Sequence, residues 1–527
     1  MSADIALVHA NVRTMNLNQP VAQAVAIKGT KIFKVGTEEE VSQLIGRDTK
    51  VINIDKKTVI PGLIDTHIHV ADFGKCLLWL DLTGAKSIKE LQNLLKEKAK
   101  QTPAEKWIIG RGWNQNRFKE KRLPNLSDLD KAASDNPVIL YHESEMICAV
   151  NSKAVVLAGI REQTAAPSGG TIDKNPQTGK LTGILRDSAT SLVWQVVLQP
   201  TSNELSEASS LACQKIAETG ITSVNWIVLL ENELPIIQRL HAEGKLLVRV
   251  NVILPETLVK ETESFQSTAF LMIHVGGVFI AIDGYLDSKT AALSEPYCDD
   301  PESNGKMLLT RAKLATSIEQ VLAMGLQPVI HAMGDKAVDI ALTVIEQISR
   351  QPKGEVVRFR IEQAAVLNQA LVERLKKQDV VVSVQPKVIA TEFSVWSATE
   401  RLGAKRAKWL HPLKSLLKEG VKVAGGSDCP MEPLNPFLGI QEAVLRGYFP
   451  EQRLSVDEAL HMYTIDAAYC SGEEKIKGSI EVGKLADLTV LSDDPLDIDT
   501  NKIKEINAEM TIINGKVVYS KPTSKTR

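Results

Sequence analysis

The sequence predicts an α/β protein: a parallel (β/α)8 TIM-type barrel, a composite β-sandwich built from both termini, and an α+β insertion after the first barrel strand. Three observations support this fold class. Eight apolar runs of strand length recur through the middle of the 527-residue chain, helical patterns separate most of them, and both ends are rich in short β-type runs. Strand–helix alternation is typical of parallel sheets, and eight repeats close a barrel.

The two ends of the chain share one pattern. DIALVHANVRTM and KVINIDKKTVI near the N-terminus, like KGSIEVGKLADLTVLS and EMTIINGKVVY near the C-terminus, are β-rich stretches bounded by turn residues. Asn514-Gly515 suits the positive φ angles of a two-residue type I′ hairpin turn. We therefore expect residues 1–60 and 478–527 to form one composite β-sandwich, and residues 61–477 to form the barrel domain.

The predicted barrel strands are, in order, Val59–Val70, Ile221–Val228, Leu246–Leu254, Gly277–Gly284, Gln327–Met333, Val357–Ala364, Val380–Pro386 and Val421–Asp428. Most later gaps hold helical patterns, such as Asn232–Glu243 and Arg311–Met324. The first gap, residues 71–215, is too long for one helix and predicts an inserted α+β lobe. An open doubly wound sheet is the alternative, but no glycine-rich phosphate-binding loop follows any of these runs.

The composition is that of a globular protein, with 44% hydrophobic and 24% charged residues. With a formal net charge of −2, we expect neither a nucleic-acid nor an anionic-membrane partner. No stretch approaches the roughly 20 apolar residues of a membrane span, and the first residues lack a signal-peptide pattern. Six widely spaced cysteines without a C-x-x-C pair indicate reduced thiols, so we expect a cytoplasmic protein.

Four polar residues stand at the ends of predicted strands. His67 and His69 end the first run, VIPGLIDTHIHV, and their i, i+2 spacing turns both to one side of a strand. His331 ends the fifth run and Asp428 the eighth. Because the carboxyl ends of barrel strands meet at one mouth, we expect the four side chains to converge there. Three imidazoles and a carboxylate suit a divalent metal, zinc first, with iron, manganese or nickel as alternatives.

Several motifs resemble one protein superfamily. PGLIDTHIHV, HAMGDKAVD, GSDCPMEPLNP and GSIEVGKLADLTVL are similar to motifs of the amidohydrolase superfamily. WIIGRGWNQNRF, VNSKAVVLAGI and DGYLDSKTAALSEPYCDDP resemble its amidohydrolase 3 branch, which includes N-substituted formamide deformylases and related amide hydrolases. The resemblance spans nearly the whole chain. It implies a (β/α)8 barrel, a composite β-sandwich, and metal-assisted hydrolysis of amide or related C–N bonds; homodimers are common in the family.

The sequence departs from this branch at two positions. Strand four of the branch carries a carbamylated lysine that bridges two metals, whereas Phe279 stands at that position here. Strand six of the branch ends in a metal-binding histidine, whereas Gln363 stands here. Phenylalanine has no donor atom, and a neutral amide is a weak ligand beside imidazole. Without the bridging anion little offsets the repulsion between two cations, so we expect one divalent ion per chain.

The orientation of three side chains follows from strand alternation. Phe279 should point into the barrel with Ala281 and Asp283, whereas Glu362, next to Gln363, should face the surrounding helices. Glu143, Glu145 and Lys289 remain open as replacement ligands for a second metal. All three residues lie on segments that we expect to be loops.

Further residues have candidate roles, although Trp113 and Arg401 could equally be packing or surface residues. Asp428 is the candidate general base and then acid, and Gln363 is a candidate hydrogen-bond donor to the substrate carbonyl. Lys289, Trp113 and Arg401 are candidates for substrate binding. The polar segment 285–306 follows strand four at the mouth and is a candidate lid; the alternative is an ordinary solvated loop.

The sequence therefore leads to three hypotheses. The first is a metal-dependent hydrolase of carbon–nitrogen bonds other than peptide bonds, acting on an amide or N-acyl or N-formyl small molecule through a metal-activated water. The second is a mononuclear deaminase of a cyclic amine. The third is a non-catalytic relative that binds a small molecule after losing the binuclear site. For all three we expect a small-molecule ligand, no nucleic-acid or membrane partner, and a homodimer as one oligomeric state.

Overall fold

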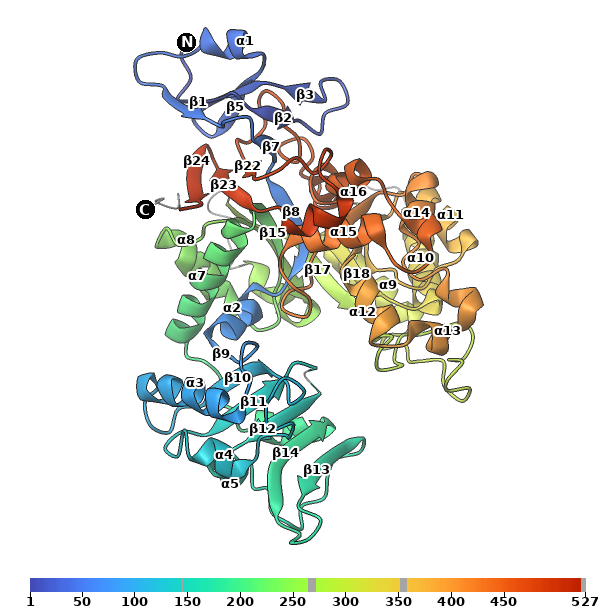
Figure 1. The fold of residues 1–527 in the computed structure, drawn as a ribbon. Coiled ribbons are helices and arrows are strands. Elements are labelled where there is room, and N and C mark those ends of the chain that lie inside the picture. The colour runs from blue at the N-terminus through green and yellow to red at the C-terminus, as the bar shows by residue number, and fades with distance from the viewer. Residues whose placement is uncertain (145, 264–271, 351–357, 523–527) are drawn as a thin grey trace. The chain divides into compact units, whose positions relative to one another are not determined.

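A computed structural model describes residues 1–144, 146–263, 272–350 and 358–522. The chain forms two compact units, drawn in Figure 1. The first contains Met1–Gly74 and Ser206–Arg527, and the second contains Lys75–Leu205. The chain leaves the first unit within helix α2 (Val70–Leu78) and returns to it within helix α7 (Ser202–Glu218).

The described part of the first unit contains an eight-stranded sheet at its centre. Its strands are, in spatial order, β8 (Leu63–Ile68), β15 (Ile221–Ile227), β16 (Arg249–Pro255), β17 (Ile273–Ala281), β18 (Gln327–Ala332), β19 (Arg360–Gln363), β20 (Val381–Val384) and β21 (Val423–Gly425). All neighbouring strands pair in parallel. Most of their residues are buried, as expected for a parallel sheet covered on both faces.

The sheet nearly closes on itself between its first and last strands. Ile68 forms a parallel bridge with Cys429, just beyond β21. The amide of Asp428 donates to the carbonyl of His67 at 2.7 Å, and the amide of His69 donates to the carbonyl of Cys429 at 3.0 Å. The predicted TIM-type barrel is therefore confirmed. Each predicted run overlaps one barrel strand, and the first run also overlaps β7 (Thr58–Pro61), which belongs to another sheet. The first residue of the sixth run, Val357, lies outside the described residues.

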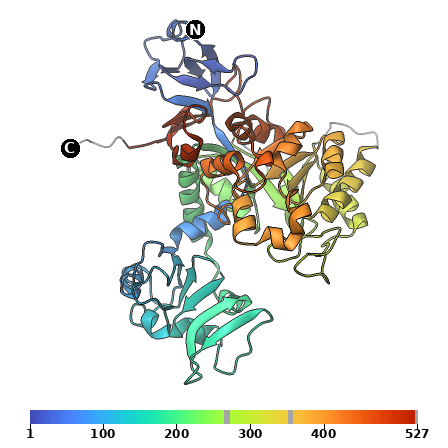
Figure 2. The same cartoon turned by 45° about the vertical axis from the view of Figure 1, so that its right-hand side comes forward.

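Helices surround the barrel strands, as Figure 2 shows from a second direction. Those that follow the strands from β15 onward are α8 (Glu233–Ala242), α9 (Arg311–Ala323), α10 (Asp335–Ser349), α11 (Gln369–Lys377), α12 (Val388–Ser394), α13 (Ala398–Ala407), α14 (Leu413–Lys418), α15 (Pro436–Leu445), α16 (Val456–Met462) and α17 (Ile465–Cys470). Helix α10 illustrates the pattern. Its buried residues Val338, Ala341, Leu342 and Ile345 recur at helical spacing and form one apolar stripe.

Both ends of the chain contribute strands to one sheet beside the barrel. The six-stranded sheet contains, in chain order, β2 (Asn11–Arg13), β3 (Val21–Ala22), β7 (Thr58–Pro61), β22 (Leu488–Leu491), β23 (Ala508–Ile513) and β24 (Lys516–Ser520). Strand β22 pairs antiparallel with β7, which joins the two ends. A four-stranded sheet contains β1 (Ile5–Val8), β4 (Ala24–Lys28), β5 (Lys31–Gly36) and β6 (Lys50–Asn53). Asn514 and Gly515 both have positive φ angles at the β23–β24 turn, as a type I′ turn requires.

A buried ion pair joins the barrel to this sheet. The Arg249 Nε, on β16, lies 2.5 Å from Asp487 Oδ2, and both side chains are only 4% exposed. The same guanidinium donates to the other oxygen of Asp487 at 3.0 Å and to the side-chain oxygen of Asn514 at 2.5 Å. A bidentate arginine–carboxylate contact fixes relative orientation as well as distance. It therefore holds the start of β22 at a defined place on the barrel.

We predict that Asp487→Ala lowers the free energy of unfolding by about 3–5 kcal/mol, because it leaves the Arg249 guanidinium buried without its counter-ion. Urea denaturation followed by circular dichroism measures the change. Asp497→Ala is the matched control, since Asp497 also pairs with an arginine, Arg13, but is 72% exposed. Exposed ion pairs contribute about 0–1 kcal/mol. Equal losses in the two variants would show that burial of the first pair has no consequence.

The described part of the second unit is an α+β lobe. Its six-stranded sheet has the spatial order β13 (Gly170–Lys174), β14 (Leu181–Asp187), β12 (Ile147–Val150), β11 (Val138–His142), β10 (Ile108–Trp113) and β9 (Leu80–Asp81). Its helices include α3 (Ile88–Gln101), α4 (Leu126–Asp130), α5 (Ser152–Leu157) and α6 (Ser191–Trp194). Leu91, Leu95 and Leu140 belong to a core between the sheet and helix α3.

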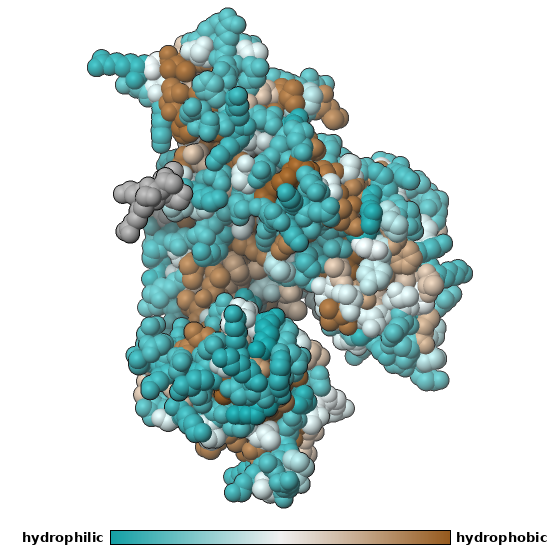
Figure 3. Space-filling model, viewed as in Figure 1, coloured by the Kyte–Doolittle hydropathy of each residue, from teal (hydrophilic) through white to brown (hydrophobic). Residues whose placement is uncertain are grey.

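The visible surface has an ordinary polar character. Hydrophilic residues predominate on the face drawn in Figure 3, and hydrophobic residues occupy smaller patches between them. Within the described ranges, no helix combines the length and the apolar character that crossing a membrane requires.

Candidate metal centre

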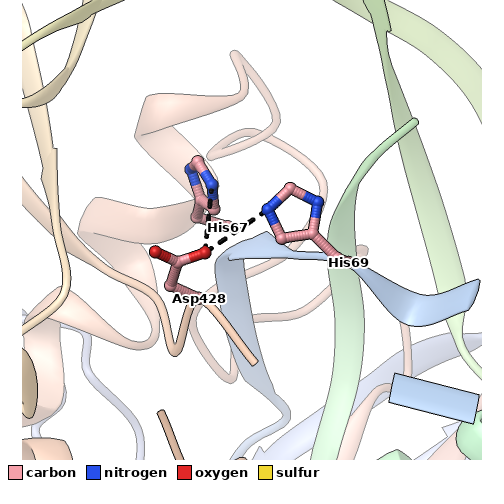
Figure 4. Close-up of side chains that lie close together, drawn as sticks. All are labelled: His67, His69 and Asp428. Carbon is pink, nitrogen blue, oxygen red and sulfur yellow. Dashed lines mark ion pairs between the residues drawn. The ribbon is translucent and has the colours of Figure 1, made fainter. Parts of the chain in front are cut away.

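Three of the four predicted ligands lie together at the carboxyl ends of the first and last barrel strands. His67 belongs to β8, His69 follows it, and Asp428 lies three residues beyond β21. Figure 4 shows the two imidazoles turned toward the carboxylate. Asp428 has a φ of 57°, a left-handed conformation that aspartate tolerates better than most residues. The backbone hydrogen bonds that close the barrel therefore also bring the ligand candidates together.

The donor atoms of these residues converge. The Nε2 atom of His69 lies 3.4 Å from Asp428 Oδ1, and the Nε2 atom of His67 lies 3.6 Å from the same oxygen. One ligand atom from each residue lies within 4.8 Å of the others. The His67 side chain is 5% exposed, whereas those of His69 and Asp428 are 17% and 19% exposed. Two imidazole nitrogens and a carboxylate oxygen in this arrangement fit a divalent metal that remains open on one side.

A buried carboxylate orients His67. The Glu362 Oε2 atom lies 2.7 Å from His67 Nδ1, so the opposite ring nitrogen faces Asp428. The expectation that Glu362 faces the helices is wrong: it is fully buried inside the barrel. Alternation from an inward-facing Gln363 would turn Glu362 outward. However, Gln363 and Ala364 have φ angles of 70° and 42°, which are not those of an extended strand. Extended geometry ends at Glu362, so its neighbour does not fix which way it points.

Burial and charge act in opposite directions in this cluster. Burial by itself would lower the pKa of His67, but the Asp428 charge and the hydrogen bond to Glu362 raise it. Burial would raise the pKa of Glu362, but the neighbouring Arg360 charge and the His67 contact lower it to about 2. Burial would also raise the pKa of Asp428, and the two imidazoles outweigh it, so that pKa is lowered. Both carboxylates are therefore ionised at neutral pH.

His331 lies beside the cluster rather than within it. Its Nε2 atom is 3.4 Å from the carbonyl oxygen of Gly284 and 3.9 Å from Asp283 Oδ1. Its ring contacts that of Tyr285, with centroids 5.1 Å apart. Burial lowers the pKa of His331, which favours the neutral imidazole that a metal ligand needs. The structure thus places His331 at the same mouth, with its ring nitrogen directed at the loop after β17.

Phe279 points into the barrel, as the sequence predicts. Its ring centroid is 6.0 Å from that of His67 and 5.9 Å from that of His331. It packs against a small buried cluster that includes Ile253 and Val329. The position at which the related branch carries a bridging lysine is therefore occupied by an aromatic ring without a donor atom.

Two buried glutamines stand at the ends of neighbouring strands. Gln363, at the end of β19, is 4% exposed, and its Oε1 atom has no hydrogen-bond partner in the part of the chain that the structure describes. Gln385, just beyond β20, is fully buried with neither side-chain polar atom partnered within the same described residues. Sequence reasoning missed Gln385. The available signal was its i, i+2 relation to Ser383, whose hydroxyl bonds to Thr66 inside the barrel.

The three substrate-binding candidates have other contacts in the structure. Trp113 is fully buried in the core of the second unit, where its indole N–H donates to the Leu140 carbonyl at 2.8 Å, so it offers no surface to a small molecule. The Lys289 ammonium lies 3.0 Å from the Asp299 carboxylate. Arg401 donates to the carbonyls of Leu286 and Asp287, which ties helix α13 to the loop after β17.

Two of the residues left open as replacement ligands, Glu143 and Glu145, belong to the segment between the first two barrel strands. Glu143 lies in the second unit and pairs with Arg117 at 2.6 Å. Glu145 lies outside the described residues.

Known proteins are similar to this chain in sequence and in fold. The profile of the Amidohydrolase family matches residues 50–519. This chain belongs to the amidohydrolase family. It is therefore a metal-dependent hydrolase by family, and the resemblance seen in its sequence motifs is confirmed.

Three relatives illustrate the similarity. The amidohydrolase is 32% identical over 514 residues to the putative amidohydrolase YtcJ of Bacillus subtilis, covering 95% of this chain and 96% of that protein. It is 27% identical to an N-substituted formamide deformylase of Arthrobacter pascens, covering 99% of both. A crystal structure of an uncharacterized metal-dependent hydrolase from Pyrococcus furiosus superposes with a TM-score of 0.78 at 29% identity, covering 94% of this chain and all of that one.

We predict that Gly426→Ala destabilises the centre. A Cβ atom at Gly426 would lie 2.7 Å from the backbone nitrogen of His67 and 3.0 Å from Asp65 Oδ1. Relieving this overlap requires a shift of β8 against the last strand, at about 1–3 kcal/mol. Thermal unfolding and bound-metal analysis measure the effect. Gly447→Ala is the control, because Gly447 is exposed and has no atom within 4 Å of the added carbon. Equal behaviour of the two variants would contradict the prediction.

Proposed function

We propose that this amidohydrolase cleaves the C–N bond of a small amide, of the N-acyl or N-formyl type, by adding water with the help of one bound divalent ion, zinc first. The observation that carries the proposal is the convergence of His67 Nε2, His69 Nε2 and the Asp428 carboxylate at the barrel mouth. Similarity over nearly full length to a formamide deformylase supports an amide substrate. His331 stands next to these atoms as a fourth candidate ligand.

The residues of the site have complementary tasks. A divalent ion bound there would supply a Lewis acid, which polarises a carbonyl and makes water more acidic. Asp428, ionised and partly exposed, accepts the proton of the attacking water and returns it to the leaving amine nitrogen. His67 and His69 fix the position of that carboxylate from two sides. The C–N bond breaks as the nitrogen takes the proton, which leaves a carboxylic acid and an amine.

The buried glutamines supply hydrogen-bonding groups of the kind that an amide substrate needs. The unpartnered Oε1 atom of Gln363 and both unpartnered polar atoms of Gln385 stand at the carboxyl ends of β19 and β20. A side-chain N–H donates to a carbonyl oxygen, and a side-chain oxygen accepts from an amide N–H. We assign Gln363 the task of donating to the substrate carbonyl. A buried polar group without a partner is costly, and a bound amide would offset this cost.

One ion per chain fits the surroundings better than two. Phe279 occupies the position of a bridging ligand, and Gln363 replaces an imidazole. Two further buried carboxylates stand beside the imidazoles, but both oxygens of Glu362 are bonded to His67 and Arg360, and both oxygens of Asp283 accept from backbone amides. A second cation would therefore have to displace one of these contacts to gain an anionic ligand.

We predict that Asp428→Asn reduces kcat/KM on a hydrolysed N-formyl or N-acyl amine by at least about 100-fold, because proton transfer contributes 10²–10⁴-fold. A panel of such amides, with release of carboxylic acid and of ammonia measured separately, identifies the substrate first. Metal content is measured in parallel. The control is Asp48→Asn, at an exposed residue in the turn before β6. Wild-type turnover in Asp428→Asn would disprove the assigned role. Ammonia release from a cyclic amine would instead favour the deaminase. If the protein binds metal but turns over none of these compounds, the result would favour the non-catalytic alternative.

We predict about one tightly bound divalent ion per chain by elemental analysis of the purified protein. Replacing Phe279 by lysine together with Gln363 by histidine should raise the content toward two, since the pair supplies a bridge and an imidazole. Each single substitution is the control and should add less. Two ions in the unmodified protein would reveal a ligand outside this set, and none after metal supplementation of folded protein would contradict the proposed centre.

A further inference from the structure

We propose that the buried Arg360–Glu362 pair is a positioning device for His67, which it holds with Nδ1 protonated so that Nε2 faces the ligand site, and that it thereby sets the affinity for the divalent ion. The inference rests on the metal centre of the proposed function. It adds two residues that neither bind the ion nor touch a substrate.

The contacts form a chain across three strands. One oxygen of Glu362, Oε2, lies 2.7 Å from His67 Nδ1 and accepts its hydrogen bond. The other oxygen accepts from the Arg360 guanidinium. Arg360 also donates to the carbonyl of Thr66 at 2.5 Å and lies 3.4 Å from the Ser383 hydroxyl. Arg360, Glu362 and Ser383 are fully buried. The pair therefore holds the ring of His67 and, through Thr66, the backbone that precedes it.

The contact with Glu362 selects the tautomer of His67. One Glu362 oxygen accepts from the Arg360 guanidinium, and the other lies 2.7 Å from His67 Nδ1. A carboxylate only accepts hydrogen bonds, so the proton of the second contact is carried by Nδ1. In the neutral imidazole, Nε2 then has its lone pair directed toward Asp428.

Stability alone does not account for this pair. Two charges without solvent contact carry a desolvation cost that well-packed apolar side chains of similar volume avoid, so a buried ion pair is weak support for a purely structural role. Hydrogen bonds that metal-binding histidines donate to carboxylates fix the ring and raise its basicity, and their loss typically weakens metal binding 10–100-fold. The position of Glu362 behind His67 matches this arrangement.

Two other histidines provide internal comparisons. The Nδ1 atom of His69 is buried without a hydrogen-bond partner in the described part of the chain, so no carboxylate stands behind that ring as Glu362 stands behind His67. His411 makes the same kind of contact as His67, with Nε2 2.7 Å from Glu392 Oε2 and both side chains fully buried, but it lies outside the ligand cluster. Glu392→Gln therefore removes an equivalent charge without touching the centre.

The first experiment measures the Kd for Zn²⁺ by competition with a chromophoric chelator, using metal-free full-length protein. We expect Glu362→Gln to bind about 10–100-fold more weakly than the wild type, because a neutral amide can accept from or donate to Nδ1. Glu392→Gln should leave the Kd unchanged. Glu362→Asp, which keeps the charge on a shorter side chain, should recover part of the loss.

The second experiment needs no variant at position 362 to fold. Long-range ¹H–¹⁵N spectra of the metal-free wild type, labelled at histidine and assigned with His67→Gln, report the tautomer directly. Recorded at a pH at which the ring is neutral, the spectra should show His67 protonated at Nδ1 only. A proton on Nε2 instead, or an unchanged Kd in folded Glu362→Gln, would overturn this inference while leaving the proposed centre intact. Absence of Zn²⁺ binding by the wild type would overturn both.

Discussion

Closure of the barrel between β8 and the segment after β21 is the constraint on which the centre depends. The backbone of Asp428 donates to His67, and that of His69 donates to Cys429, so the ligand candidates themselves supply the closing hydrogen bonds. Asp65 reinforces the junction, because one of its oxygens accepts from the amides of both His67 and Ser427 at 3.0 Å. Any displacement of these two strands would separate the imidazoles from the carboxylate.

Alternating charge extends from this junction into the barrel interior. Starting at Arg360, the order is cation, carboxylate, imidazole, carboxylate and imidazole, ending at His69. Each charged group has its counterpart within hydrogen-bond or ion-pair distance, which offsets its removal from water. The apolar ring of Phe279 borders this series on one side. This row of polar side chains is thus bordered by a volume that an aromatic group fills.

Hydrogen bonds and an ion pair hold the loop after β17 in place. Asp283, directly after the strand, accepts from the amides of Ala292, Met333 and Gly334 at 2.9 Å each. Arg401 joins the loop to α13, and Lys289 pairs within it. Charged residues that sequence inspection assigns to substrate binding therefore shape the rim of the site. The same loop carries Tyr285 to the ring of His331.

The sequence by itself determined the barrel, its strand order and the identity of the central ligand candidates. Local periodicity is sufficient for this, because eight buried strands leave eight apolar runs and an i, i+2 spacing turns His67 and His69 to one side. Recurring motifs added the family. The inward position of Phe279 also followed from alternation along a regular strand.

Only the tertiary structure decided which further side chains reach the centre. Glu362 and His67 are 295 positions apart, and their contact depends on the backbone turning to positive φ directly after Glu362. Likewise, Trp113 is part of a separate core, and His331 is turned toward Asp283 by the loop that packs over it. Local patterns specify which face of a regular strand a residue occupies. At strand ends regularity stops, and long-range packing and charge pairing choose the direction of each side chain.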